Sequence, residues 1–321
     1  MLIKKRDDIP PSEITEPEIW IRRRELIKAA ALGAGLLASG RALPLSGAPT
    51  VRRGEKIPNV RESRYSTKEE PTDYEIITSY NNFVELGSGK RRPALRSDSL
   101  RTRPWILKVE GECEAPGEIG IEEILKVFPQ EERIYRLRCV EAWAMVVPWV
   151  GFPLGDMLKR FKPTSQAKYV AFETLYDPNQ MPGQISGLYD WPYREGLRMD
   201  EAMHPLTILA AGLYGEGLPG QNGAPLRLVV PWKYGYKSIK SIVRISFTKR
   251  EPPTTWNRLQ PEEYGFYSNV NPKVSHPRWN QRSHRMVGDG WFARRRTTEM
   301  FNGYADQVAH LYAGMDLRKF Y

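Results

Sequence analysis

The sequence predicts a mixed α+β domain that is rich in β-strands. Runs rich in β-branched and aromatic residues predict strands over residues 105–110, 134–139, 169–174, 205–214, 224–231 and 242–247. Helical spacing of apolar residues predicts two short helices, over residues 119–128 and 153–161. The chain has no internal repeat, no G-x-G-x-x-G run and no P-loop, so repeat folds and these nucleotide-binding motifs are excluded.

The individual elements follow from local patterns. In the second predicted strand, Tyr135, Leu137 and Cys139 alternate with arginines, so we expect these three side chains on one face. The second predicted helix has Pro153 in its first turn, where the missing N–H of proline costs nothing. Residues 233–240 are rich in turn-forming residues and separate the last two predicted strands.

The composition is that of an ordinary globular protein. The chain has 321 residues, 40% of them hydrophobic, with nine Trp and sixteen Tyr, which suffices for one large core or two modest ones. The net charge is +10, but Lys and Arg are spread along the chain without a compact basic stripe. We therefore expect no nucleic-acid partner, although some of these cations could contact phosphate in a cofactor cleft.

The N-terminal residues 1–48 predict a twin-arginine export signal. Arg22, Arg23 and Arg24 precede an apolar run over residues 29–38, which is too short to cross a bilayer. The pattern predicts that the export machinery delivers the folded protein to the periplasm, and proteins exported this way commonly carry a redox cofactor. Cleavage after any of three alanines stays open: Ala38, Ala42 and Ala48. Residues 49–80 are polar and predict an extended arm, and residues 81–321 predict a single catalytic domain.

Cys139 is the strongest candidate for chemistry. The neighbouring Arg136 and Arg138 would favour the thiolate, which is the form that binds metals, although a small core residue is the plain alternative. Cys113 lies in a turn-like segment, and we expect no disulfide between it and Cys139. The chain has only two cysteines and four scattered histidines, so the protein alone cannot cage a metal. A metal on Cys139 would need a cofactor that supplies the other ligands.

Four motifs together resemble one enzyme family. They are Tyr80-Asn-Asn-Phe, Arg133-Ile-Tyr-Arg-Leu-Arg-Cys-Val-Glu-Ala-Trp, Gln221-Asn-Gly-Ala-Pro-Leu-Arg and Pro231-Trp-Lys-Tyr-Gly-Tyr-Lys-Ser-Ile-Lys. They resemble the molybdopterin-dependent periplasmic methionine sulfoxide reductase catalytic subunit, within the sulfite oxidase superfamily. The resemblance implies the sulfite oxidase molybdopterin-binding fold and one Mo-molybdopterin per chain.

The same resemblance implies roles for individual residues. It makes Cys139 the molybdenum ligand. Residues that would contact the pterin or its phosphate are Asn81, Val84, Glu85, Thr174, Asn222, Arg227, Ser238, Ile239 and Lys240. Val84 departs from the aromatic residue expected in relatives, which is harmless if only the main chain is used there. Taken singly, Thr174 could merely end a strand, Arg227 could face water and Asn222 could simply form a turn.

Glu141 is a further candidate near the metal. If the strand continued past Cys139, Glu141 would face the same way and could influence proton supply or substrate access. The alternative is a surface carboxylate paired with an arginine.

The implied reaction is oxygen-atom transfer from methionine sulfoxide in oxidised periplasmic proteins, which yields methionine and water. The sequence has no cytochrome-type motif, and the resemblance implies that a haem-bearing membrane subunit supplies the electrons.

Two other functions are also compatible with the sequence. A sulfite oxidase, or a relative acting on another S- or N-oxide, belongs to the same superfamily. A sulfite-oxidising enzyme should show Gly-Asn-Arg soon after the cysteine, whereas Val140-Glu-Ala-Trp follows here and favours a neutral sulfoxide. An exported binding protein with a structural Cys139 is the second alternative, and metal content distinguishes it from both enzymes.

Overall fold

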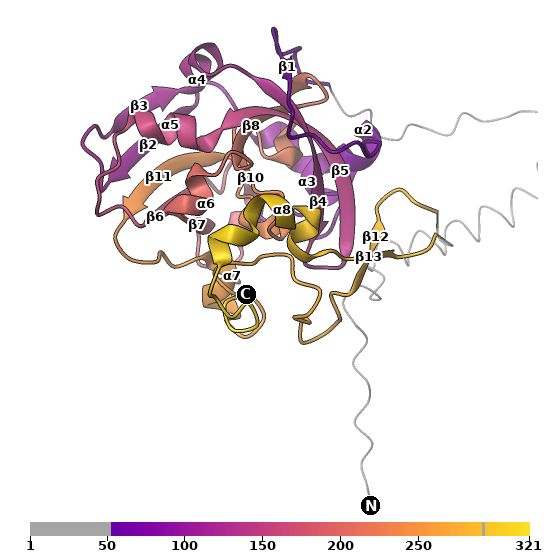
Figure 1. The fold of residues 1–321 in the computed structure, drawn as a ribbon. Helices are drawn as coiled ribbons and strands as arrows, with labels where there is room; N and C mark the ends of the chain where they lie inside the picture. Colours follow the sequence, from indigo (N-terminus) through magenta and orange to yellow (C-terminus); the bar gives the residue numbers. More distant parts are fainter. Residues whose placement is uncertain (1–52, 291–292) are drawn as a thin grey trace, which may run out of the picture. The chain divides into compact units, whose positions relative to one another are not determined.

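The computed structural model describes residues 53–290 and 293–321, and the predicted export signal lies outside them (Figure 1). Strands of the described part form two sheets. The larger sheet contains β1 (Arg61–Glu62), β4 (Glu131–Cys139), β5 (Trp143–Pro153), β8 (Ile208–Leu213), β9 (Glu216–Gly217), β10 (Arg227–Val229), β12 (Ser283–Met286) and β13 (Arg296–Thr297). Its main path runs β1-β4-β5-β12-β13, and β8 joins it through β5 while also pairing with β9 and β10.

The smaller sheet has the order β3-β2-β11-β6-β7. Its strands are β2 (Ile106–Gly111), β3 (Gly117–Gly120), β6 (Tyr169–Thr174), β7 (Arg194–Arg198) and β11 (Ile242–Thr248). Strand β11 is parallel to β2 and antiparallel to β6, so the sheet is mixed. Short helices connect the strands, which confirms the predicted strand-rich α+β class.

The helices of the described part are all short. The α-helices are α2 (Tyr74–Ser79), α3 (Arg92–Arg96), α4 (Ile121–Val127), α5 (Leu154–Arg160), α6 (Met199–Met203), α7 (Thr255–Leu259) and α8 (Ala305–Val308). The 3₁₀ turns are η1 (Ser97–Ser99), η2 (Pro182–Ile185), η3 (Gly220–Asn222), η4 (Gly235–Lys237), η5 (Met300–Gly303) and η6 (Ala309–Tyr312). Within the ranges that the structure describes, no helix is long and apolar enough to span a membrane.

The predicted elements are present with shifted ends. All six predicted strands and both predicted helices appear, and the longest strand, β5, was not predicted. Ten of its eleven residues are buried, so it lacks the alternation of a half-exposed strand, and Pro148 falls in its middle. Strand β5 pairs with both β4 and β8 and thereby forms the centre of the larger sheet.

The strand that carries Cys139 ends at this residue. Cys139 pairs with Trp143 across a tight hairpin, and Ala142 in the turn has a φ of 60°. The condition under which Glu141 would share the face of Cys139, a strand that continues past this residue, is therefore not met, because the chain reverses direction between the two residues.

Residues 74–79 are helical rather than extended. In α2, Ile77 is 2% exposed, and Tyr74 and Thr78 are also buried. Intrinsic preference did not indicate this helix, because β-branched Ile and Thr are weak helix formers. Packing against the rest of the domain decides the conformation instead.

Candidate cofactor site

Cys139 lies buried at the end of β4. Its side chain is 7% exposed, and Asn82 Nδ2 donates a hydrogen bond to Sγ at 3.6 Å. Burial raises the pKa of the Cys139 thiol to about 12, Glu141 adds to this rise, and Lys90 and Arg138 oppose it only partly. The protein alone therefore keeps the thiol protonated. A metal cation at Sγ would supply the positive charge that a thiolate needs in this setting.

The expectation that flanking arginines favour the thiolate is wrong. The Arg138 guanidinium is fully buried, but it donates to the Cys139 carbonyl and, at 2.7 Å, to Gln281 Oε1. Arg136 turns away and pairs with Glu69 and Glu299. Burial raises the pKa of the Cys139 thiol by more than the nearby Arg138 guanidinium lowers it, because a sulfur anion loses its hydration when it is buried.

Glu141 lies beside the thiol because of the turn. Its Oε2 accepts a hydrogen bond from Trp143 Nε1 at 2.8 Å and a short one from Lys90 Nζ. Burial raises the pKa of Glu141, but Lys90 outweighs it, and the pKa lies below its usual range. The carboxylate is thus ionised, and its partner is a lysine rather than the arginine of the plain alternative.

Two buried amides converge on one carbonyl of α2. Asn81 Nδ2 and Asn222 Nδ2 both donate to the Ile77 oxygen, at 2.9 and 3.1 Å. Their Oδ1 atoms are buried and have no hydrogen-bond partner among the described residues. Such acceptors are costly to leave unpaired, so the pair fits a ligand that presents N–H donors, as a pterin ring does.

Arg227 is a buried cation rather than a water-facing one. It is 3% exposed, and its Nη atoms donate to the carbonyl oxygens of Asn222 at 2.9 Å and Ser238 at 3.1 Å. Its guanidinium carbon lies 4.5 Å from the centroid of the Trp149 ring. Burial lowers the pKa of Arg227 to about 9, and no carboxylate within the described part pairs with it. This environment suits an anion such as phosphate.

The segment that precedes β11 meets β6 and η3 at the same place. Ser238 Oγ accepts from the Val230 amide at 3.2 Å, and the Ile239 carbonyl accepts from the Leu228 amide at 2.9 Å. Thr174 Oγ1 donates to the Lys240 carbonyl at 2.8 Å, so Thr174 does more than end its strand.

Gly223, which follows Asn222, is needed for this close approach. Its φ is +103°, and a Cβ there would lie 2.8 Å from Cγ of Lys240. Asn222 therefore does form a turn, which was the simpler explanation for this residue, and it also contributes its side-chain amide to the site.

Glu85 and Lys240 are two further ionisable residues of this region, and each shifts the pKa of the other. Glu85 is 4% exposed, and burial raises the pKa of its carboxyl while Lys240 lowers it. Burial likewise lowers the pKa of Lys240, with Glu85 and Cys139 opposing this shift.

Val84 meets its neighbours through the main chain. A Cβ on Gly183 would lie 2.0 Å from the Val84 oxygen, and the Gly183 amide donates to the Glu85 carbonyl at 2.8 Å. An aliphatic side chain at position 84 is compatible with this main-chain contact.

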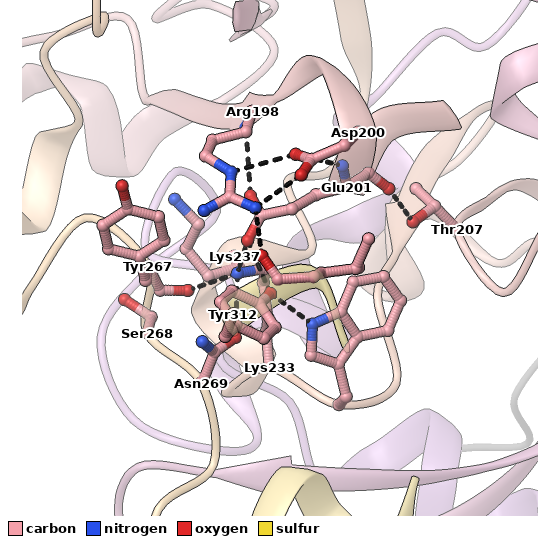
Figure 2. Close-up of polar contacts among 12 residues, drawn as sticks. Arg198, Asp200, Glu201, Thr207, Lys233, Lys237, Tyr267, Ser268, Asn269 and Tyr312 are labelled. Carbon is pink, nitrogen blue, oxygen red and sulfur yellow. Dashed lines mark hydrogen bonds and ion pairs between the residues drawn. The ribbon is translucent and has the colours of Figure 1, made fainter. Parts of the chain in front are cut away.

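Buried ion pairs hold the loop over residues 231–240 in place (Figure 2). Lys233 Nζ lies 2.6 Å from Glu201 Oε1, and both side chains are fully buried. Lys233 also donates to Asn269 Oδ1 at 2.9 Å, and the Tyr312 hydroxyl donates to Glu201 at 2.5 Å. This network fixes the loop that leads to Ser238, Ile239 and Lys240.

Two cavities of the described part lie outside the predicted cofactor site. A cavity of about 510 Å³ is lined by residues such as Glu62, Arg133 and Pro205 and includes none of the predicted site residues. A smaller cavity of about 30 Å³, lined by Val140, Tyr234 and Gln281 among others, has room for a water molecule and also includes none of the predicted site residues.

Comparisons with known proteins show the family of this chain. Residues 94–256, half of the chain, match the oxidoreductase molybdopterin binding domain family. The protein-methionine-sulfoxide reductase catalytic subunit MsrP of Xanthomonas axonopodis pv. citri is 56% identical over 317 residues, which cover 98% of each chain. The corresponding subunit of Burkholderia mallei is 53% identical, with full coverage of both chains. The chain belongs to this family. The predicted molybdopterin-dependent oxidoreductase is thereby confirmed, and the description of the relatives as catalytic subunits implies a partner subunit.

A comparison with solved structures includes a partial match. The sulfane dehydrogenase SoxCD from Paracoccus pantotrophus has a TM-score of 0.43 and 17% sequence identity, over 69% of this chain and 57% of that chain.

The residues that the sequence had not assigned are Asn82 and Lys90. Asn82 lies within the recognised motif next to Asn81, so its position was visible but its bond to sulfur was not. A loop brings Lys90 back to Asn82 and Glu141, and within it Gly87 and Gly89 have φ values of +149° and +80°. No spacing rule predicts such a return.

Proposed function

We propose that the chain reduces methionine sulfoxide residues of oxidised periplasmic proteins to methionine. The observation that carries this proposal is the 53–56% identity to MsrP catalytic subunits over essentially the whole chain. The site is consistent with it, because Glu141 beside Cys139 is paired with Lys90, so this pair offers no net positive charge that would attract an anion such as sulfite.

In this proposal each chain holds one Mo-molybdopterin, with Cys139 as the protein ligand of molybdenum. When bound, this group accepts the sulfoxide oxygen and supplies two electrons. Residues from five segments would hold it: Asn81, Val84, Glu85, Thr174, Asn222, Arg227, Ser238, Ile239 and Lys240. The two unpaired amide oxygens suit the N–H donors of the pterin, and the buried cations suit its phosphate.

Glu141 is the catalytic carboxylate of the proposal. Reduction of one sulfoxide consumes two electrons and two protons and releases methionine and water. The Glu141 side chain is 38% exposed, so solvent protons can reach the site along it.

We also propose that the electrons come from a haem-bearing membrane subunit. The relatives are named catalytic subunits, which implies a second subunit. The sequence of this chain carries no second redox motif that could receive electrons directly. A protein exported folded through the twin-arginine pathway would meet this partner at the periplasmic face of the membrane.

The decisive assay compares three substrates side by side. Purified holoenzyme with a reduced dye as electron donor is given an oxidised protein, a free sulfoxide and, with an oxidising dye, sulfite. Turnover of the first two is expected, and turnover of sulfite alone would contradict the proposal.

A substitution at the sulfur tests the ligand assignment. Cys139→Ser is expected to lower molybdenum-dependent sulfoxide reduction by at least about 1000-fold, because the metal loses its thiolate. Cys113→Ser is the matched control, since Cys113 is the second free thiol. Activity, molybdenum content and circular dichroism are measured for both. Undiminished turnover by Cys139→Ser would reject the assignment.

A further inference from the structure

Lys90 contacts two polar groups at the rim of the cysteine site. Its Nζ donates to Asn82 Oδ1 at 2.5 Å and to Glu141 Oε2. The Lys90 side chain is 27% exposed, and Nζ lies 5.9 Å from the ring centroids of both Tyr80 and Trp143. The ammonium is therefore held between a carboxylate, an amide and two aromatic rings.

The contact with Lys90 fixes which way the Asn82 amide faces. A lysine ammonium has three donors and no acceptor, so only the oxygen of Asn82 can face it. The Asn82 Nδ2 group then faces Cys139, with 3.6 Å between nitrogen and sulfur. A metal-bound thiolate can only accept, so this orientation is the one that stabilises the sulfur anion.

The backbone supports the same arrangement. The Asn81 amide donates to the Lys90 carbonyl at 2.8 Å, which closes the loop over residues 82–89. Within it, Phe83 and Gly87 form a β-bridge. Lys90 thus returns to Asn82 as part of a closed loop.

A hydrogen bond to a metal-bound sulfur changes the metal. It withdraws electron density from the thiolate, which stabilises the reduced metal and raises its reduction potential. The direction of the Asn82 amide therefore affects how readily the metal accepts electrons from the partner.

We propose that Lys90 is a positioning residue: it orients the Asn82 amide toward Cys139 and thereby raises the reduction potential of the bound metal. The inference rests on the proposed function for the presence of molybdenum at Cys139. It adds a residue outside the cofactor contacts that controls the electron affinity of the site.

The test is a redox titration of the holoenzyme without substrate, followed by the electron paramagnetic resonance signal of Mo(V). Lys90→Met, which keeps the length but removes the donors, is expected to lower the midpoint potential and to change the signal. Lys90→Arg keeps the donors and the charge and is expected to restore both. Lys159→Met is the control, because Lys159 forms a solvent-exposed pair with Asp156. Molybdenum content per chain is measured for every variant.

A double-variant cycle separates orientation from charge. If Lys90 acts through the amide, its substitution in an Asn82→Ala background is expected to produce less than about half the shift that it produces alone. An equal shift in both backgrounds would mean a charge effect only and would overturn the proposal. An unchanged potential in fully loaded Lys90→Met would overturn it as well.

Steady-state kinetics give a second readout. We expect about tenfold lower kcat for Lys90→Met with a nearly unchanged KM for the sulfoxide, because one hydrogen bond to a charged group is lost. These potentials are measured without substrate, so a failure of the sulfoxide assay in wild-type enzyme would overturn the proposed function and leave the Lys90 result interpretable.

Discussion

Two lysine–glutamate pairs in this domain have opposite settings. Lys90 and Glu141 lie beside Cys139 with side chains 27% and 38% exposed. Lys233 and Glu201 are both fully buried, and Asn269 and Tyr312 complete their hydrogen bonding (Figure 2). These two pairs therefore place the same chemistry at a rim open to solvent and inside the sealed interior of the fold.

The difference shows what each pair contributes. An exposed pair adds little to stability, because water screens its attraction, so its value lies in the orientation of neighbouring groups. A sealed pair is costly to form and more costly to leave half-formed, so its network imposes one conformation on the loop over residues 231–240.

The largest expected effect concerns the sealed pair. Lys233→Met leaves the Glu201 carboxylate buried without its cation, and we expect a loss of about 3–5 kcal/mol in the free energy of unfolding. Adding Glu201→Gln should recover part of the loss. Lys90→Met, the same change at the exposed pair, should cost less than about 1 kcal/mol. Urea unfolding of the variants measures all three values, and equal losses at both lysines would remove the distinction.

The buried polar surroundings also predict acid sensitivity. Burial, with help from Arg138, lowers the pKa of His284 to about 4, and its Nδ1 lies 2.9 Å from Thr298 Oγ1. Because the unfolded histidine has a pKa of about 6.5, the unfolded state binds more protons between these values. The contribution of His284 is therefore complete above pH 6.5 and is lost as the pH falls to 4, at most about 3 kcal/mol.

The variant His284→Asn tests this dependence. Asparagine keeps a polar contact with Thr298 but does not titrate, so the unfolding free energy should fall less between pH 7 and pH 4. Urea unfolding at several pH values gives both curves, and parallel curves would exclude His284 as the source.

The exposure of Lys240 is intermediate between that of a sealed lysine and that of a surface lysine. We expect the substitution of Lys240 to have a smaller effect than the changes above, and to act on cofactor retention. Lys240 is partly exposed and faces the buried Glu85, and we assign it to the phosphate of the cofactor. Lys240→Ala should weaken cofactor retention about tenfold, as expected for one charge-assisted contact, while loaded molecules keep most of their turnover. Molybdenum per chain and activity normalised to molybdenum separate these outcomes. A loss that appears only after normalisation would count against the assignment.

Local sequence predicted much of the fold. Strands with clear alternation or β-branched composition, such as β6, were located almost to the residue. Strand β5 was missed because a strand buried on both faces has no alternation, and α2 was missed because its residues are weak helix formers. In both cases the conformation depends on partners that are distant in the chain.

The candidate site shows the same division. The motif around Cys139 was visible in the sequence, and the described residues contain no group of three or more His, Cys, Asp or Glu side chains that could hold a metal ion. The effect of the protein surroundings on the metal-free thiol was predicted wrongly, because the flanking arginines were visible in the sequence whereas burial was not.

The sequence by itself determined the family, the strand-rich class and the lone cysteine, because motifs and periodicity are local properties of the chain. Only the tertiary structure decided that Asn82, 57 residues away, donates to Cys139, and that Lys90 orients this amide. It also decided which lysine–glutamate pairs are sealed from solvent. Distance and desolvation govern these properties, and both arise only when remote segments pack together.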